Sequence, residues 1–240
     1  HRRRHSFPTR RSSDLNPYVF ERLAIGHWGL LVGYAALYVY VAPWHLPGDA
    51  WYTWVIAILG VDLIYYTYHR MAHRVRLFWA THQAHHSSEY FNLSTALRKG
   101  AFQTAFDWPF YLPLALLGVP PLVFITVASL NLLYQFWVHT RHIPKLGWLE
   151  WVLITPSNHR VHHAQNPAYL DRNYGGVFIL WDRLFGTFKE EDPAEPVVFG
   201  VTTPLASWNP LWANLHRIFD RQRQDDPDAY RLITPERVEI

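Results

Sequence analysis

Asp62–Lys99, with the sequence DLIYYTYHRMAHRVRLFWATHQAHHSSEYFNLSTALRK, is the stretch that decides the fold. Five of its residues are histidines: His69, His73, His82, His85 and His86. The first two are spaced i, i+4 and the last three i, i+3, i+4. On α-helices, each set therefore projects its imidazoles from one face. The spacing predicts two helices that present histidine side chains as groups.

Two further histidine clusters lie downstream, His139 with His142 and His159 with His162 and His163. The four clusters hold ten of the chain's 15 histidines, and the chain has no cysteine. Imidazole suits zinc, copper, iron and nickel, whereas a closed structural zinc site takes four ligands and usually includes cysteine. Ten imidazoles are too many for one ion but suit two ions with four or five each. The Glu-x-x-His pattern of soluble di-iron bundles does not occur, so the clusters predict an all-nitrogen dinuclear centre.

The composition favours a membrane protein of one domain. The chain has 240 residues, and its charged residues make up 17%, below the roughly 25% of soluble domains. Aromatic residues also reach 17%, with 12 Trp, and membrane proteins concentrate Trp and Tyr at their interfaces. The net charge is +3, but the basic residues form short runs beside apolar stretches. This pattern fits a cytoplasmic membrane face better than a nucleic-acid partner.

The chain divides into three parts. Residues 1–15, HRRRHSFPTRRSSDL, resemble translated adapter sequence, and the alternative is a basic, disordered head or targeting segment. Residues 16–207 are predicted to form a membrane-embedded domain. Residues 208–240 form a polar C-terminal tail.

Four apolar stretches predict about four membrane helices, and therefore an all-α fold with a helical cap that carries the histidines. They are Ala24–Ala42, Ala50–Tyr68, Ala101–Leu117 and Leu122–Val138. The last two are joined by the turn Gly118–Pro121. Each arm of this hairpin would span about 25 Å as a helix, so it could cross the bilayer or be re-entrant.

The distribution of Lys and Arg predicts the side of the membrane. If all four stretches cross, every histidine cluster lies on the same side. The loops on the other side, Pro43–Asp49 and Gly118–Pro121, contain no Lys or Arg. The histidine side carries several: Arg70, Arg74, Arg76, Arg98, Lys99, Arg141 and Lys145. The positive-inside rule therefore predicts a cytoplasmic site in a multi-pass protein, of a bacterial inner membrane or the endoplasmic reticulum.

The expected chemistry is oxidation of a lipid. Histidine ligation beside a bilayer leaves room for O2, and iron is the common metal for oxidising unactivated C–H bonds, while zinc has no redox chemistry. Polar residues near the clusters are candidates for orienting the imidazoles, with helix capping or a solvated surface role as the alternative. They are Asp62, Glu89, Asn92, Asn158 and Asp182.

The motifs HRMAH, HQAHHSSE with YFNLSTALRKG, and NHRVHH resemble the three histidine boxes of the fatty acid hydroxylase / sterol desaturase superfamily. The likeness runs from about Asp62 to Phe188. It is strongest to the alkylglycerol monooxygenase-like branch, in SSEYFNLSTALR, NLLYQFWVHT, TPSNHRVHHAQNP and WDRLFGTF. The resemblance implies a helical membrane fold, two Fe ions, O2 as co-substrate and a lipid substrate. It assigns eight box ligands: His69, His73, His82, His85, His86, His159, His162 and His163. His139 matches a further superfamily histidine, and the His142 position varies between branches.

Lipid monooxygenation is the first functional reading, and a desaturase that uses the same centre is the alternative. A non-enzymatic metal transporter is disfavoured, because a transporter places its ligands within the spans. A haem protein would need isolated facing histidines. Animal enzymes of the resembled branch use a tetrahydropterin and carry an acidic residue directly after the second histidine of the first box. Arg74 occupies that position here. This cation favours an electron-donor protein over a pterin.

Overall fold

The computed structural model describes residues 27–100 and 103–202, and this part of the chain is helical. Its elements are α2 (His27–Tyr40), α3 (Trp51–Arg74), α4 (Arg76–His86), α5 (Leu93–Leu97), α6 (Gln103–Asp107), η3 (Trp108–Tyr111), α7 (Leu112–Leu116), α8 (Pro121–Trp137), η4 (Gly147–Trp151), α9 (Pro156–His162) and α10 (Leu180–Leu184). The only β-pairing within it consists of two isolated bridges. The all-α prediction is confirmed. The predicted head, residues 1–15, and the predicted tail, residues 208–240, lie outside the described residues.

The two longest helices, α3 and α8, form where the sequence has long apolar runs, which in α3 include the buried Asp62 and end at His69. α8 begins with Pro121 in its first turn, where a missing N–H costs nothing. Its buried side chains recur every three or four residues: Val123, Phe124, Val127, Asn131 and Gln135. The exposed side of α8 is also apolar: Leu122 is 75% exposed and Leu133 is 67% exposed. Helices that are apolar on all sides occur in buried or membrane settings.

One apolar core joins α2, α3, α7 and α8. Val61 of α3, Leu114 of α7 and Phe124 of α8 are each at most 2% exposed. The Tyr34 ring of α2 stacks on Phe124 with the centroids 4.3 Å apart, and its hydroxyl donates to Val119 O. Each fully buried side chain of this size contributes about 1.5–3 kcal/mol of stability. This core fixes α3 relative to α8, and both helices run from it toward the histidine clusters.

The third apolar stretch does not form one continuous α-helix. Between Gln103 and Leu116 the chain forms three short helical pieces, α6, η3 and α7. Pro109 and Pro113 lie where η3 and α7 begin. Proline lacks an N–H and its ring clashes with the preceding turn, which prevents a continuous α-helix through this segment.

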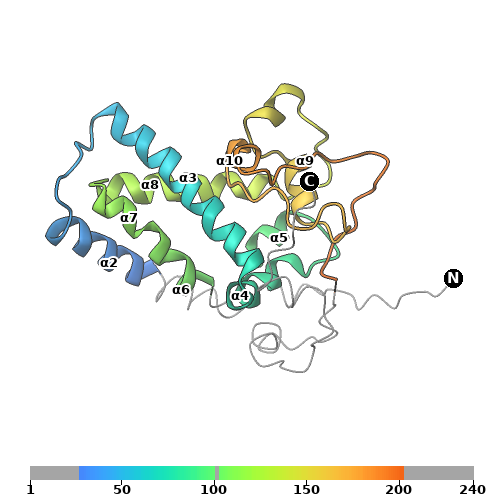
Figure 1. Ribbon diagram of the computed structural model, residues 1–240, viewed down its shortest axis with the longest axis horizontal. Coiled ribbons are helices and arrows are strands. Elements are labelled where there is room, and N and C mark those ends of the chain that lie inside the picture. Colours follow the sequence, from blue (N-terminus) through green and yellow to red (C-terminus); the bar gives the residue numbers. More distant parts are fainter. Residues whose placement is uncertain (1–26, 101–102, 203–240) are drawn as a thin grey trace.

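The two loops that lack Lys and Arg lie against each other. Leu46 N donates to Gly118 O at 2.8 Å, and the Trp44 indole donates to Leu117 O at 3.1 Å. Gly118 has a φ of +77°, and a Cβ there would lie 2.5 Å from Trp44 O, so only glycine fits this contact. Figure 1 shows both loops at the end of the molecule opposite α9 and α10. The pairing agrees with the expected arrangement of two hairpins that share one end.

Within residues 27–100 and 103–202, no helix combines the length and the apolar character needed to cross a bilayer. The four-pass arrangement therefore stays a prediction.

Candidate metal centre

Nine of the ten predicted histidines come together in two adjacent groups. Within each group, the ligating nitrogens all lie within 4.8 Å of one another. The first group comprises His69, His73, His82, His86 and His162, and the second comprises His85, His139, His159 and His163. Their rings come from α3, from α4, from the end of α8 and from α9. Three segments that are distant in sequence, residues 69–86, residue 139 and residues 159–163, thus meet at one place.

The nitrogen spacing within each group matches the spacing around one metal ion. In the first group, the Nε2 atom of His82 lies 3.0 Å from that of His69 and 3.1 Å from that of His86. In the second group, His159 Nε2 lies 2.9 Å from His139 Nε2 and 3.2 Å from His163 Nε2. Metal–imidazole bonds of about 2.0–2.1 Å place neighbouring ligand nitrogens roughly 3.0–3.4 Å apart. Each group therefore fits one ion.

Stacked imidazole rings lie between the two groups. His86 of the first group and His163 of the second stack with centroids 4.3 Å apart and planes 17° apart. His85 and His163 both belong to the second group, and their centroids are 4.5 Å apart. His159 and His162 also stack across the groups, with centroids 5.3 Å apart. Because the two groups are in direct ring contact, two bound ions would be neighbours, as in a dinuclear centre.

Hydrogen bonds to carbonyl groups hold the proton on the outer nitrogen of several rings. The Nδ1 atoms of His69, His139 and His162 donate to Tyr174 O at 2.8 Å, Gln135 O at 2.7 Å and Arg172 O at 2.9 Å. His85 Nδ1 lies 3.0 Å from both Thr95 O and Arg98 O, and His82 Nδ1 lies 3.4 Å from Gln103 Oε1. With the proton on Nδ1, each Nε2 presents a lone pair to its group.

Burial keeps these rings neutral. It lowers the pKa of all nine imidazoles, to about 3 for His82 and His139 and to about 4 for His162. The lone pairs are therefore available at neutral pH. The Nε2 atoms of His73 and His162, both in the first group, are buried without a hydrogen-bond partner. A metal ion held by this group would satisfy them.

His142 is not part of either group. Its side chain is exposed, and its backbone N–H donates to Thr140 Oγ1 at 3.2 Å. The chain turns outward after α8, which carries His142 away from His139. The structure therefore brings nine of the ten predicted histidines together.

Two of the predicted orienting residues, Asp62 and Asp182, are buried, and both accept hydrogen bonds from backbone N–H groups of the loop at residues 174–178. Asp62 accepts hydrogen bonds from Val177 N at 2.7 Å and Phe178 N at 3.0 Å. Asp182 accepts from Tyr174 N at 2.7 Å and from the next backbone N–H at 2.8 Å. Tyr174 also supplies the carbonyl for His69. Both carboxylates therefore act on a histidine through the loop.

The other three predicted orienting residues have different positions. Glu89 is exposed. Asn92 caps α5, since its Oδ1 accepts from Ser94 N at 2.9 Å. Asn158 donates to Leu153 O at 3.2 Å, and its own carbonyl accepts from Asn173. None of these contacts reaches an imidazole directly. The direct acceptors are mostly backbone carbonyls, which a sequence pattern does not reveal.

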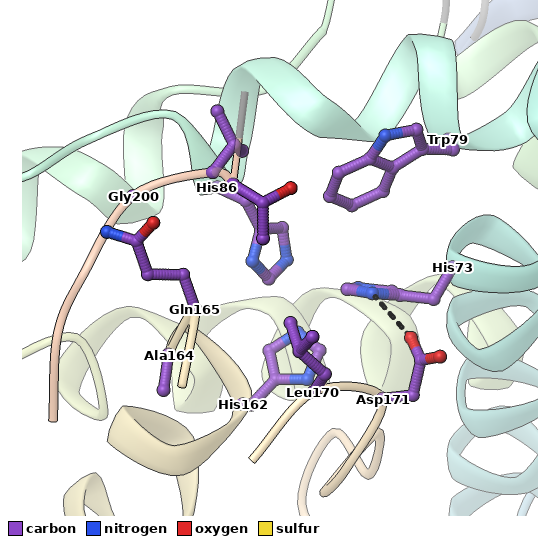
Figure 2. Close-up of a pocket in the computed structure, with 11 residues that line it drawn as sticks. His73, Trp79, His86, His162, Ala164, Gln165, Leu170, Asp171 and Gly200 are labelled. Atoms are coloured by element: carbon purple, nitrogen blue, oxygen red, sulfur yellow. Dashed lines mark ion pairs between the residues drawn. The ribbon is translucent and has the colours of Figure 1, made fainter. Parts of the chain in front are cut away.

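A pocket opens onto the first group, and Arg74 lies at its edge. Figure 2 shows the rings of His73, His86 and His162 directed toward one another in this pocket, with Trp79, Gln165 and Leu170 around them. The Asp171 carboxylate lies 3.9 Å from His73 Nδ1 and 3.7 Å from Arg74 Nε. Sequence reasoning did not identify Asp171, which lies in a loop with a φ of 59°. The positive charge of Arg74 is therefore paired at this edge.

Comparison with known proteins identifies similar chains. The family model described as fatty acid hydroxylase matches residues 54–187, more than half of the chain. Alkylglycerol monooxygenase of Homo sapiens is 52% identical over 175 residues, which cover 73% of this chain and 39% of the relative. The Caenorhabditis elegans alkylglycerol monooxygenase is 39% identical over 191 residues, covering 77% and 38%.

An ornithine lipid hydroxylase of Rhizobium tropici is also similar, at 28% identity over 166 residues that cover 68% of this chain and 50% of the relative. The chain spans less than half the length of the alkylglycerol monooxygenases named above. No solved structure matches the chain.

Proposed function

The chain belongs to the fatty acid hydroxylase family, and on this premise we propose that it is a di-iron, O2-dependent monooxygenase that hydroxylates a membrane lipid. The observation that carries the proposal is the pair of adjacent all-histidine groups with neutral rings and inward lone pairs. Iron bound there would supply the oxidation of an unactivated C–H bond by O2. The names alkylglycerol monooxygenase and ornithine lipid hydroxylase support a lipid substrate.

In this proposal, nine histidines hold the two Fe ions, five in the first group and four in the second. The carbonyl groups of Tyr174, Gln135 and Arg172 keep the proton on the outer nitrogen and fix the ring planes. Such partners of metal ligands commonly change metal affinity or activity by about 10–100-fold. The pocket beside His73, His86 and His162 gives access to the first group.

We place the four apolar stretches, residues 24–42, 50–68, 101–117 and 122–138, in a membrane, as part of a domain of residues 16–207 whose histidine groups lie at the cytoplasmic side. The apolar exposed faces of α3 and α8 support this, because Ile56, Leu130 and Leu133 would otherwise meet water. The loops without Lys or Arg, paired at the far end, support the orientation. A lipid substrate would then reach the site without leaving the bilayer.

The experiment that tests this function combines metal analysis with lipid mass spectrometry. Purified active protein should hold two irons per chain. With isotopically labelled O2 it should add one labelled oxygen atom to a lipid. A product that has instead lost two hydrogens would identify a desaturase. One iron or none in active protein would contradict the dinuclear centre.

For the reductant, we propose an electron-donor protein and no dependence on a pterin. Arg74 stands where the resembled enzymes carry an acidic residue, so a direct acceptor for pterin N–H groups is absent from this position. Its pairing with Asp171 reduces the net charge there. Turnover of an alkylglycerol ether with tetrahydropterin and O2 as the only additions would contradict the proposal. In Arg74→Glu, a gain of such turnover would show that this charge selects the reductant.

A further inference from the structure

We propose that Asp62 is a positioning residue that links the two histidine groups, so that one carboxylate sets the orientation of His69 in the first group and of His139 in the second. The inference deepens the proposed function and rests on it. Asp62 lies on α3 two turns before His69, and it is 1% exposed. Two chains of hydrogen bonds start from its carboxylate.

The first chain of hydrogen bonds runs to His69. Asp62 Oδ1 accepts from Val177 N at 2.7 Å, and Oδ2 accepts from Phe178 N at 3.0 Å. These bonds hold the loop whose Tyr174 carbonyl accepts the Nδ1 proton of His69 at 2.8 Å. The loop lies directly on the carboxylate, because a Cβ added at Gly176 would be 2.9 Å from Asp62 Oδ1.

The second chain of hydrogen bonds runs along one face of α8 to His139. Asn131 Nδ2 donates to Asp62 Oδ1 at 2.9 Å, and Gln135 Nε2 donates to Asn131 Oδ1. Gln135 O in turn accepts from His139 Nδ1 at 2.7 Å. The backbone N–H of His139 bonds to Phe136 O instead, which leaves the Gln135 carbonyl to the imidazole. These α8 residues are four apart, so they share one face.

The position requires a carboxylate and not an amide. Counting the Trp181 indole, which donates to Oδ2 at 2.9 Å, four N–H donors point at Asp62. An Asn at position 62 would have one acceptor oxygen and would turn its NH2 group toward some of these donors. The loop and α8 would then separate from α3, and the carbonyls of Tyr174 and Gln135 would shift with them.

The test uses three variants of the full chain, loaded with ferrous iron alone. Asp62→Asn breaks both hydrogen-bond chains, and Asn131→Leu breaks only the one that reaches His139. Trp181→Phe is the matched control, because it removes one donor to Asp62 that belongs to neither chain. Iron per chain and the Mössbauer spectrum of the two iron sites are measured beside the thermal midpoint of the metal-free protein.

We expect Asp62→Asn to weaken iron binding about 10–100-fold and to change the spectra of both sites. Asn131→Leu should change one site, and Trp181→Phe should match the wild type. Two irons with unchanged spectra in Asp62→Asn would overturn the proposal. If Asp62→Asn does not fold, Asn131→Leu decides, and a change at both sites or at neither would count against it. Wild-type protein that binds two irons but oxidises no lipid would contradict the proposed function alone.

Discussion

In several histidines of the two groups, a hydrogen bond at Nδ1 fixes the orientation of the ring. Where Nδ1 donates to a carbonyl, as in His69 and His139, the ring cannot rotate without losing that bond, and Nε2 stays aimed at its neighbours. His86 and His163 have a second role, since their rings stack on each other where the two groups meet. Removing either ring should affect both ions.

We therefore predict that His86→Ala and His163→Ala each bind at most one iron and lose activity, while the proteins still insert into membranes. The matched control is His142→Ala, which removes an exposed histidine outside both groups and should keep two irons and full turnover. Metal analysis and the lipid assay on the three purified variants check this. Retained turnover in His86→Ala or His163→Ala would remove that residue from the ligand set.

The sequence alone predicted most of this site, because spacing on a helix determines which side chains share a face. His69 and His73, one turn apart on α3, show this. The spacing could not place His142, because the path of the chain after α8 depends on tertiary packing. Nor could it identify Tyr174 O or Gln135 O as acceptors, since every residue carries a carbonyl and only the fold selects one.

An ion pair between Arg160 and Glu191 holds helix α9 in place. This helix carries His159 and His162 of the groups, His163 follows it directly, and Thr155 caps its first turn. Arg160 within it donates to Ile143 O at 2.7 Å and to both carboxylate oxygens of Glu191, at 2.9 and 2.6 Å. Burial alone would raise the pKa of Glu191, but hydrogen bonds from Arg160 and Ser157 outweigh it and hold this pKa below 4.5. The pair fixes α9 to the segment after α10, and the bond to Ile143 O fixes it to the chain that follows α8.

We predict that Glu191→Gln lowers the free energy of unfolding by about 1–3 kcal/mol, because it leaves the mostly buried Arg160 without its charged partner. The matched control is Glu190→Gln, which breaks the exposed pair with Lys145 and should cost less than about 1 kcal/mol. Thermal or denaturant unfolding of the two variants compares them. Equal losses would contradict the assigned role of Arg160.

The same pair predicts a dependence on pH. The pKa of Glu191 is lower in the folded chain than its ordinary value of 4.5, so the unfolded chain binds the proton more readily. The stabilisation is therefore complete above about pH 4.5 and disappears as the pH falls through the folded pKa. The stability difference between wild type and Glu191→Gln should shrink over that acid range, which a series of melts at different pH can measure.

For the molecule as a whole, the exposed apolar faces of α3 and α8 and the two paired end loops indicate how the chain would be oriented in a bilayer. The sequence predicted α8 well, because nothing interrupts its apolar run. It gave the weakest support to the stretch before the turn, which contains Asp107, Pro109 and Pro113, and there the structure forms short helical pieces. The two stretches have the same length, and the charge and the two prolines of the first account for the difference.

We predict that Leu122→Cys, near the paired loops, reacts with an impermeant maleimide only from the side opposite Glu190→Cys. Both side chains are well exposed, and the chain has no cysteine of its own. Gly118 is unsuitable for labelling, because a side chain there would collide with Trp44 O. A Leu122→Cys protein that resists labelling from the opposite side would favour the re-entrant hairpin over four passes.

The nine imidazoles of the two groups come from α3, α4, the end of α8 and α9. This arrangement has a consequence for the amount of intact protein in a cell. Binding energy at such a site is folding energy, so iron supply would control the abundance of intact protein as well as its activity. In the usual order of divalent affinities, zinc binds nitrogen ligands more tightly than ferrous iron. During iron starvation, mismetallation by zinc would yield chains that resist proteolysis and catalyse nothing.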